Sequence, residues 1–209
     1  MSGPSIASPG ATLPAATAIV LAGGRSSRFG RDKLAEPVGG RRLLDHAVTA
    51  AASVAREVLV LVPPVAPAPP LPAADAPVVV VRDPEPFGGP LVAVLAGLER
   101  ARESLALVVG GDMPSLSSTV LAAMLRRLDS SGADAVVLGY RGRPEPLPAA
   151  FRVGAATPAA RRLLGSGVRS LQSLAGALRT VELAEMEWRS LDPAAATLRD
   201  VDRPEDLPT

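Results

Sequence analysis

Cysteine is absent from this sequence of 209 residues, and aromatic residues make up only 2% of it. Without cysteine, the chain can form neither a disulfide framework nor a thiolate nucleophile, and nothing places it in an oxidising compartment. Hydrophobic residues nevertheless reach 47%, so the core must be built from Val, Leu and Ala packed between regular elements. We therefore expect a cytoplasmic protein with layered helices and sheet.

The sequence also lacks a strong excess of charge and long apolar runs. Its formal net charge is +1, which removes the broad basic surface that proteins use to bind nucleic acid. No run reaches the roughly 18 apolar residues of a membrane helix, and residues 1–15 have neither the basic start nor the apolar stretch of a signal peptide. We expect no nucleic-acid or membrane partner, a flexible tail over residues 1–15 and a single domain over residues 16–209.

Lysine is almost missing as well. Lys and Arg together number 22, and Lys33 is the single lysine. Abundant Arg, Ala, Pro and Gly suggest GC-rich coding, which explains why lysine is scarce. It does not explain why one lysine stands at the end of the loop "LAGGRSSRFGRDK", Leu21–Lys33. Lys33 is therefore a candidate functional residue.

Short apolar runs alternate with helical patterns along the chain, as in parallel strands joined by crossover helices. Apolar residues recur at helical spacing over 44–51, 91–98 and 121–128. Five strands are predicted, at residues 17–24, 57–62, 77–83, 105–112 and 133–140. The pattern predicts a three-layer α/β/α domain with a mostly parallel sheet, in which ligands bind beyond the carboxyl ends of the strands.

Pro, Ser and Gly define the segments between these elements. Residues 63–77 are rich in Pro and Ala without a period, which predicts an exposed, partly polyproline connection. Ser117 or Ser118 is expected to cap the third helix, and Gly132 to lie just past its end.

The C-terminal third carries weaker signals. Thr157 and Pro158 are expected to be the N-cap and first residue of a helix, and a short helix is expected over residues 168–178. The solitary Trp188 and Tyr140 are expected to have packing roles.

The glycine-rich loop is the strongest candidate for a binding site. Gly23 and Gly24 allow the backbone to approach an anion without a Cβ in the way, and Arg25, Arg28 and Lys33 add positive charge. The spacing matches neither a Rossmann G-x-G-x-x-G turn nor a P-loop. Residues alone therefore indicate either a phosphate-binding loop or a structural turn.

Four motifs occur together in an order that carries a family resemblance. They are "LAGGRSSRFGRDK", "DPEPFGGPL", "GGDMP" and "LRDVDRPEDL". In this order and at these separations they resemble the molybdenum cofactor guanylyltransferases, over about Ala18 to Leu207. The resemblance implies a Rossmann-like nucleotidyltransferase fold.

The resemblance also implies roles for particular residues. The backbone of the first motif would wrap the nucleotide, and Arg28 and Lys33 would act in catalysis at its phosphates. Asp83 would contact the nucleotide, and Asp112 would be both catalytic and a Mg²⁺ ligand. The implied nucleotide-binding residues are Leu21, Ala22, Gly23, Gly24, Lys33, Asp83 and Asp112, and the implied metal ligands are Asp112 and Asp202.

Several of these acids have a simpler alternative. Asp112 could instead cap a helix, and Asp83 could form the turn before Pro84. The acids of "DVD", Asp200 and Asp202, stand where the family often has a pair of Asn. Either could complete the metal site or contact the pterin, and Asp202 could equally cap the last helical turn.

The implied reaction is Mg²⁺-dependent transfer of GMP from GTP to the phosphate of molybdopterin cofactor, with release of pyrophosphate. The pairing of "LAGG" with "GPL" favours GTP, whereas an Asn of the guanylyl branch after the second strand is absent. Transfer of CMP or another nucleotide, and a nucleotide-binding module without catalysis, are the alternatives. Cofactor-delivery proteins are a further class of partner that the resemblance suggests.

Acceptor contacts are a weaker implication. Residues 143–151 resemble the acceptor-side segment of the family, with its His replaced, and Arg169 and Ser170 could face the acceptor as well. His46 lies on a predicted Ala-rich helix away from the strand ends, so a structural role is expected for it rather than that of a general base.

Overall fold

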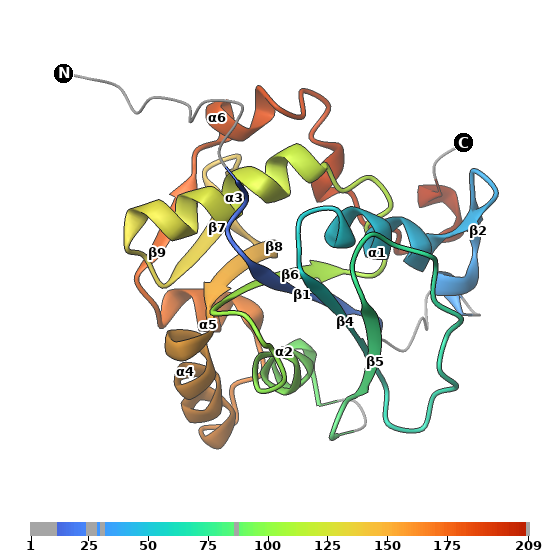
Figure 1. The fold of residues 1–209 in the computed structure, drawn as a ribbon, viewed down its shortest axis with the longest axis horizontal. Coiled ribbons are helices and arrows are strands. Elements are labelled where there is room, and N and C mark those ends of the chain that lie inside the picture. Colours follow the sequence, from blue (N-terminus) through green and yellow to red (C-terminus); the bar gives the residue numbers. More distant parts are fainter. Residues whose placement is uncertain (1–11, 24–28, 30–31, 86–87, 208–209) are drawn as a thin grey trace.

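The computed structural model describes residues 12–23, 29, 32–85 and 88–207. Its centre is a seven-stranded sheet in the order β5-β4-β1-β6-β8-β7-β9, with helices on both faces (Figure 1). The strands are β1 Ala16–Leu21, β4 Glu57–Val62, β5 Val78–Arg82, β6 Leu105–Gly110, β7 Ala135–Tyr140, β8 Arg143–Arg152 and β9 Thr180–Leu183. A separate two-stranded ladder pairs β2, Pro37–Val38, with β3, Arg41–Arg42.

All pairings in the main sheet are parallel except those of β8. Strand β1 pairs in parallel with β4 and β6, β4 with β5, and β7 with β9, whereas β8 runs antiparallel to β6 and β7. The predicted three-layer fold with a mostly parallel sheet is therefore confirmed. The carboxyl ends of β5, β4, β1 and β6 consequently lie side by side at one edge.

The two faces of the sheet carry separate cores. Helices α1, Leu43–Ala52, and α3, Ser118–Ser131, cover one face, while α2, Pro90–Leu98, α4, Val153–Gly165, and α5, Leu171–Gly176, cover the other (Figure 1). Every residue of β4 and of β6 is buried, as expected for strands covered on both faces.

Close backbone packing compensates for the scarcity of large side chains. A Cβ on Gly97 of α2 would lie 2.8 Å from Cδ1 of Ile19 on β1, so only glycine lets this helix approach the sheet so closely. Trp188 is fully buried on α6, Glu185–Arg189, and its Nε1 donates to the carbonyl of Gly139 at 2.9 Å. Its ring lies 5.9 Å from that of Tyr140, which confirms the packing predicted for both residues.

The ends of α3 follow the prediction. Ser117 is the N-cap, and its hydroxyl accepts from the backbone N–H of Val120 at 3.5 Å. Gly132 at the C-cap has a φ of 66°, in the left-handed region that glycine adopts without steric cost. Helix α5 lies inside the predicted range 168–178 and begins after Ser170.

The predicted start of α4 is wrong. The helix begins at Val153, and Thr157 lies inside it, where its hydroxyl donates to the carbonyl of Val153 at 2.8 Å. Pro158 is therefore an internal residue near the N-terminal end of the helix, where its missing N–H removes one hydrogen bond. The Thr-Pro pair resembles a helix start because Pro is favoured at the first helical position.

Strand β8 was not predicted, because prolines at 144, 146 and 148 argue against a strand. Residues 149–152 pair with β6 and carry no proline. The pairing with β7 shifts in register between Val137 and Gly139, whose partners on β8 are Ala149 and Pro144. Pro146 and Pro148 thus fall in the irregular part of the strand.

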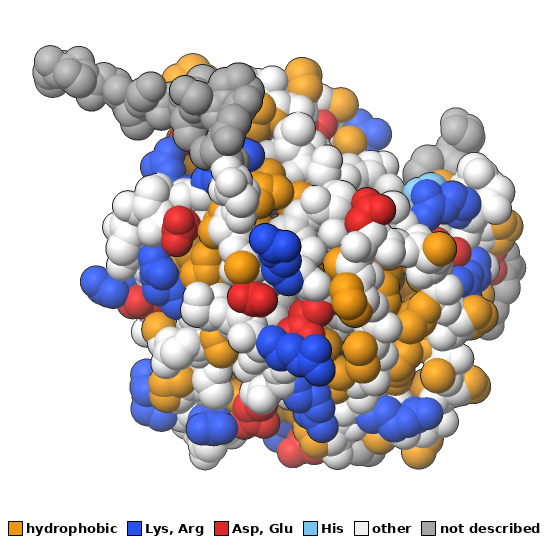
Figure 2. Space-filling view, in the orientation of Figure 1, with side chains coloured by type: hydrophobic (Ala, Val, Ile, Leu, Met, Phe, Trp, Pro, Cys, Tyr) orange, Lys and Arg blue, Asp and Glu red, His pale blue; other side chains and the backbone are white. Residues whose placement is uncertain are grey.

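The connection over residues 63–77 is only partly exposed. Leu71 and Ala74 pack against the core under α1 and α3, and Ala76 is buried. Figure 2 shows hydrophobic side chains along the edge formed by β5 and this connection, where Val79 is 47% and Val65 is 91% exposed. The same view shows basic and acidic side chains interspersed.

In the described part of the chain, three short 3-10 turns complete the fold: η1 Lys33–Ala35, η2 Ala196–Leu198 and η3 Pro204–Asp206. Within the described residues, no helix has the length and apolar character needed to cross a membrane.

Candidate functional site

The carboxyl ends of β1 and β6 form the base of the candidate site. Leu21 is aligned with Gly110 at the end of the two strands, and the N–H of Gly111 donates to the carbonyl of Leu21 at 2.9 Å. On the other side of β1, the N–H of Ala22 donates to the carbonyl of Leu61 on β4 at 2.8 Å. The chain is thereby fixed on both sides up to Gly23, whose backbone is exposed.

The space around both glycines of "GGD" is tight. A Cβ on Gly110 would lie 2.5 Å from Oδ1 of Asp112, and a Cβ on Gly111 would lie 3.0 Å from the carbonyl oxygen of Leu21 and 3.1 Å from Cδ1 of Leu44. The N–H of Gly110 is close to Sδ of Met113, at 3.4 Å. These contacts fix the backbone that carries Asp112.

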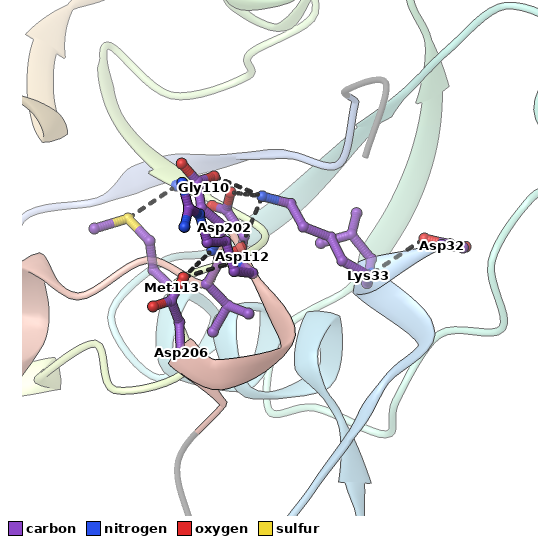
Figure 3. A network of polar contacts seen from close by, with 10 residues as sticks. Asp32, Lys33, Gly110, Asp112, Met113, Asp202 and Asp206 are labelled. Atoms are coloured by element: carbon purple, nitrogen blue, oxygen red, sulfur yellow. Dashed lines mark hydrogen bonds and ion pairs between the residues drawn. The ribbon is translucent and has the colours of Figure 1, made fainter. Parts of the chain in front are cut away.

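Lys33 begins the turn η1 and points back toward the strand ends. Asp32 caps this turn, since its Oδ1 accepts from the N–H of Leu34 at 3.1 Å. The Lys33 ammonium donates to Oδ2 of Asp112 at 2.7 Å, to the carbonyl of Val201 at 2.9 Å and to Oδ1 of Asp202 at 3.4 Å (Figure 3). The lysine singled out in the sequence therefore lies between the acids of the third and fourth motifs.

The surroundings of Lys33 keep it charged. Burial lowers its pKa, because only 14% of the side chain is exposed, but the hydrogen bonds and charges of Asp112 and Asp202 outweigh this effect. The net pKa is raised above the ordinary value of 10.5. The site thus holds a permanent cation in partial shelter from water, where its interaction with an anion is stronger than at the surface.

The C-terminal segment with "DVD", residues 200–202, completes the site through the backbone of Val201. The N–H of Val201 donates to the carbonyl of Asp112 at 3.0 Å, and Val201 is 1% exposed, in a small core with Phe29, Val38 and Leu43. Burial raises the pKa of Asp200, the residue before Val201, and the negative charges of Asp112 and Asp202 raise it further, whereas the charge of Lys33 lowers it. "DVD" therefore lies beside Asp112.

Asp192 and Thr197 fix the residues that precede Asp200 in the chain. The carboxylate of Asp192, which is 8% exposed, accepts from the N–H of Thr197 at 2.7 Å. The hydroxyl of Thr197 in turn accepts from the N–H of Ser117 at 3.0 Å. The start of α3, directly after "GGDMP", is thereby joined to the segment that leads to Val201.

Both capping alternatives are wrong for the acids of the site. Ser117, not Asp112, caps α3. The turn η3 begins after Arg203, and the N–H groups of Asp202 and Arg203 both donate to Oδ2 of Asp206, at 3.1 and 2.8 Å. The carboxylates of Asp112 and Asp202 are consequently directed toward Lys33 and not toward a helix end.

The donor set at this position can be compared with the needs of Mg²⁺. This ion takes one or two carboxylates together with water and substrate phosphates. Asp112 and Asp202 satisfy that requirement, with 26% and 49% of their side chains exposed. Among the described residues, no group of three or more His, Asp or Glu is arranged to hold a metal ion. Metal binding by this pair stays a prediction.

Asp83 follows β5 at the same edge of the sheet. Its N–H donates to the carbonyl of Val62 at 2.8 Å, and its Oδ1 accepts from the N–H of Glu85 at 3.3 Å, so the expected turn is present. Burial raises the pKa of Asp83. The hydrogen bond from the N–H of Glu85 lowers this pKa, whereas the negative charge of Glu85 raises it further. A contact with the nucleotide is compatible with this turn and stays a prediction.

Other predicted residues have different outcomes. Gly24 and Arg28 lie outside the described residues. His46 has a structural contact, with Nε2 at 2.9 Å from the carbonyl of Val38. Ser170 caps α5 by accepting from the N–H of Ser173 at 3.4 Å, which is the role that its sequence position alone did not reveal.

Arg169 joins the second motif to the segment before α5. Its Nη1 donates to Oε2 of Glu85 at 2.8 Å and to the carbonyl of Gly88 at 3.1 Å. Gly89, with a φ of 87°, lies against the Arg169 side chain, since a Cβ there would be 3.1 Å from Cβ of Arg169. Neither this contact nor the Val201 carbonyl could be found by sequence reasoning, because each depends on tertiary placement.

Comparison with known proteins identifies the family. Residues 18–181 match the MobA-like NTP transferase domain. The chain belongs to the MobA-like NTP transferase family. Its relatives include proteins named probable molybdenum cofactor guanylyltransferase from Chloroflexus aggregans, 35% identical with 90% of each chain covered, and from Mycobacterium tuberculosis, 36% identical with 86% of this chain and 88% of the other covered.

Solved structures agree on the fold of this family member. Molybdopterin-guanine dinucleotide biosynthesis protein A from Archaeoglobus fulgidus has a TM-score of 0.73 at 19% identity, with 91% of this chain and 94% of that one covered. A 2-C-methyl-D-erythritol 4-phosphate cytidylyltransferase from Thermus thermophilus has a TM-score of 0.65 at 21% identity, with 90% and 94% covered. The family resemblance read from the four motifs is confirmed, and the protein is a nucleotidyltransferase.

Proposed function

We propose that the protein transfers GMP from GTP to the phosphate of a molybdopterin-type acceptor and releases pyrophosphate. The observation that carries the proposal is the position of Lys33, 2.7 Å from Asp112 at the carboxyl ends of β1 and β6, the same strand ends at which Gly23 is exposed. The relatives named as guanylyltransferases support the choice of nucleotide and acceptor.

The reaction is a substitution at the α-phosphorus of GTP. An oxygen of the acceptor phosphate forms the new bond to phosphorus, and the bond between the α-phosphorus and the bridging oxygen to the β-phosphate breaks. The electron pair leaves with pyrophosphate, so the acceptor itself supplies the nucleophile. The protein contributes positioning and electrostatic stabilisation, which agrees with a chain that contains no cysteine and whose His46 is held by Val38.

Lys33 supplies the charge that this substitution requires. Its ammonium is kept protonated by Asp112 and Asp202. A compact ammonium on a flexible stem can exchange a carboxylate partner for a phosphate oxygen and follow the charge that develops near the α-phosphorus. Gly23 is exposed two residues after the end of β1, and without a Cβ its backbone would let phosphates approach closely.

Asp112 and Asp202 are the residues that would hold Mg²⁺. When bound there, the ion would offset the negative charge of the phosphates and of the pyrophosphate leaving group. Asp112 is the better fixed of the two, because the carbonyl of the same residue accepts from Val201 and its backbone is enclosed by the contacts of Gly110 and Gly111. Asp202 is nearer the surface.

The choice of nucleotide and acceptor is tested by a pyrophosphate-release assay. The full-length protein is incubated with Mg²⁺, molybdopterin and each of GTP, CTP, ATP and UTP in turn. We expect release with GTP and formation of a dinucleotide product. Turnover with CTP and none with GTP would replace the guanylyl assignment by a cytidylyl one. Binding of GTP without any transfer would instead favour a nucleotide-binding module.

A further inference from the structure

The edge strand β5 ends in Arg82, whose side chain contacts the residues that follow the neighbouring strand β4. Nη1 of Arg82 donates to the carbonyls of Ala66 at 2.7 Å, Pro64 at 3.0 Å and Pro63 at 3.5 Å. These residues form the turn that follows β4, which is closed by the N–H of Ala66 donating to the carbonyl of Pro63 at 3.2 Å. One guanidinium nitrogen therefore fixes a whole turn.

This turn depends on Arg82 more than an ordinary turn depends on a surface side chain. Pro63 and Pro64 have no N–H, so the turn can supply few donors for its own carbonyls. Arg82 is exposed and lies at the edge of the sheet, away from the two cores. Its role is thus to hold the turn and not to fill the interior.

The turn lies directly against the candidate site. Cγ and Cδ of Pro63 are each 3.9 Å from the position that a Cβ on Gly23 would occupy. Asp83, the residue after Arg82, donates its N–H to the carbonyl of Val62, the residue before Pro63, at 2.8 Å. Gly23, Pro63 and Asp83 therefore meet where β1, β4 and β5 end.

Under the proposed function, this meeting point is where the nucleoside would lie. The phosphates belong near Lys33 and Asp112, at the ends of β1 and β6, and the acceptor must approach the α-phosphorus opposite the leaving group. The nucleoside would then extend from Gly23 over the ends of β4 and β5, past the apolar ring of Pro63 and the carboxylate of Asp83. A wall at Pro63 is useful only if its turn is held in place.

We propose that Arg82 is a positioning residue that holds the turn Pro63–Ala66 as a wall of the nucleoside-binding side. The inference rests on the proposed function, because it requires a nucleoside triphosphate at Gly23. Loss of Arg82 lets the turn sample other conformations, which must be ordered again when the nucleotide binds. The cost falls on binding and not on the chemical step, since Lys33 and Asp112 are unchanged.

The experiment compares Arg82→Ala, Arg82→Lys and a matched control, Arg161→Ala. Arg161 is an exposed arginine on α4, on the other core, and its side chain is bound to Glu99 at 2.8 Å. GTP binding is measured by titration calorimetry, turnover by pyrophosphate release, and folding by thermal unfolding. We expect Arg82→Ala to raise the Kd and KM for GTP about tenfold and to change kcat less than about twofold.

The lysine variant separates positioning from general destabilisation. A single ammonium can still donate to two or three of the turn carbonyls, so Arg82→Lys is expected to recover part of the GTP affinity. Arg161→Ala is expected to bind GTP as the wild type does. Wild-type affinity in Arg82→Ala, or a loss of kcat without a change in KM, would overturn the inference while leaving the proposed function intact. Failure of the wild type to bind GTP would overturn both.

Discussion

Lys33 and Asp112 are separated by 79 positions in the sequence, yet their side chains meet at 2.7 Å. The same ammonium also reaches the carbonyl of Val201 and the carboxylate of Asp202. One lysine therefore connects the loop after β1, the end of β6 and the C-terminal segment. Its position accounts for a lysine at the end of the loop in a chain that otherwise uses arginine.

Replacement of Lys33 by arginine is the most direct test of this role. A planar guanidinium cannot occupy the position of an ammonium with acceptors at 2.7, 2.9 and 3.4 Å without displacing them. We expect Lys33→Arg to lower kcat for GTP about 100-fold, as is typical for loss of a positioned electrostatic group. Pyrophosphate release at saturating GTP measures this. The exposed exchange Arg161→Lys serves as control, and wild-type kcat in Lys33→Arg would contradict the proposed role of Lys33.

The two glycines of "GGD" give a second prediction. Gly111→Ala places a Cβ against the carbonyl of Leu21 and against Leu44, so it is expected to lower the free energy of unfolding by about 1–3 kcal/mol. Gly110→Ala forces the Asp112 carboxylate to move, so it is expected to reduce turnover as well. Denaturant unfolding and the pyrophosphate assay measure the two effects.

Gly154 on α4 is the matched control for this pair. A Cβ there has no atom within 4 Å, so Gly154→Ala is expected to be neutral or to stabilise the protein by up to about 1 kcal/mol. If Gly111→Ala were as stable as Gly154→Ala, the close approach of β1 and β6 would not be the reason for the glycine.

The parts of the fold that follow from local pattern were predictable from the sequence. Continuous apolar runs identified β1, β4, β6 and β7, because strands buried on both faces need such runs. The edge strand β5 was identified by its run of valines, although Val81 is its one buried residue. Strand β8 was not, since its pairing with β6 is confined to four residues after the prolines. The Thr-Pro pair at 157–158 led to a wrong prediction of the helix start. Proline favours the first helical position, but here the helix begins earlier, at Val153, and contains Pro158.

The candidate site could be predicted where a charged side chain stands at the end of a predicted strand or of a motif. Lys33 and Asp112 stand at such ends, the family resemblance added Asp202, and the structure brings all three together. The carbonyl of Val201 could not be predicted as a ligand of Lys33, because every residue type has a backbone carbonyl. The contacts of Arg82 could not be predicted either, because nothing in the sequence around Arg82 indicates which residues it contacts. The family motifs added residues that spacing alone left open.

Asp192 gives a prediction about pH and stability. Burial raises its pKa, but hydrogen bonds from Thr197 and Ala196 and the charge of Arg199 outweigh burial and hold it below the ordinary value of 3.8. A carboxyl with a lowered pKa in the folded state stabilises the protein above its unfolded pKa, and this stabilisation is lost as pH falls through the folded pKa. We expect Asp192→Asn to lower the free energy of unfolding by about 1–2 kcal/mol at pH 7.

The difference between wild type and Asp192→Asn should begin to shrink below about pH 4, where the unfolded chain takes up the proton first, and should be lost as pH falls through the lowered pKa of the folded state. Denaturant unfolding between pH 3 and pH 8 follows this change. Asp75→Asn, at an exposed position of the connection over residues 63–77, is the control and is expected to match the wild type. A difference that stays constant over this range would contradict the role of the Asp192 charge.

Metal dependence gives the last prediction, because Asp112 and Asp202 are unequal candidates for holding Mg²⁺. Asp112 is closer to Lys33, less exposed and fixed by the contacts around it, whereas Asp202 is half exposed and 3.4 Å from the ammonium. We expect chelation with EDTA to abolish pyrophosphate release, and Asp112→Asn to raise the Mg²⁺ concentration for half-maximal rate at least about tenfold, more than Asp202→Asn does. Titration of turnover with Mg²⁺ measures both shifts, and Arg161→Ala again provides the reference. An unchanged Mg²⁺ requirement in Asp112→Asn would remove this residue from the metal site, whereas a larger shift in Asp202→Asn would make the more exposed acid the principal ligand.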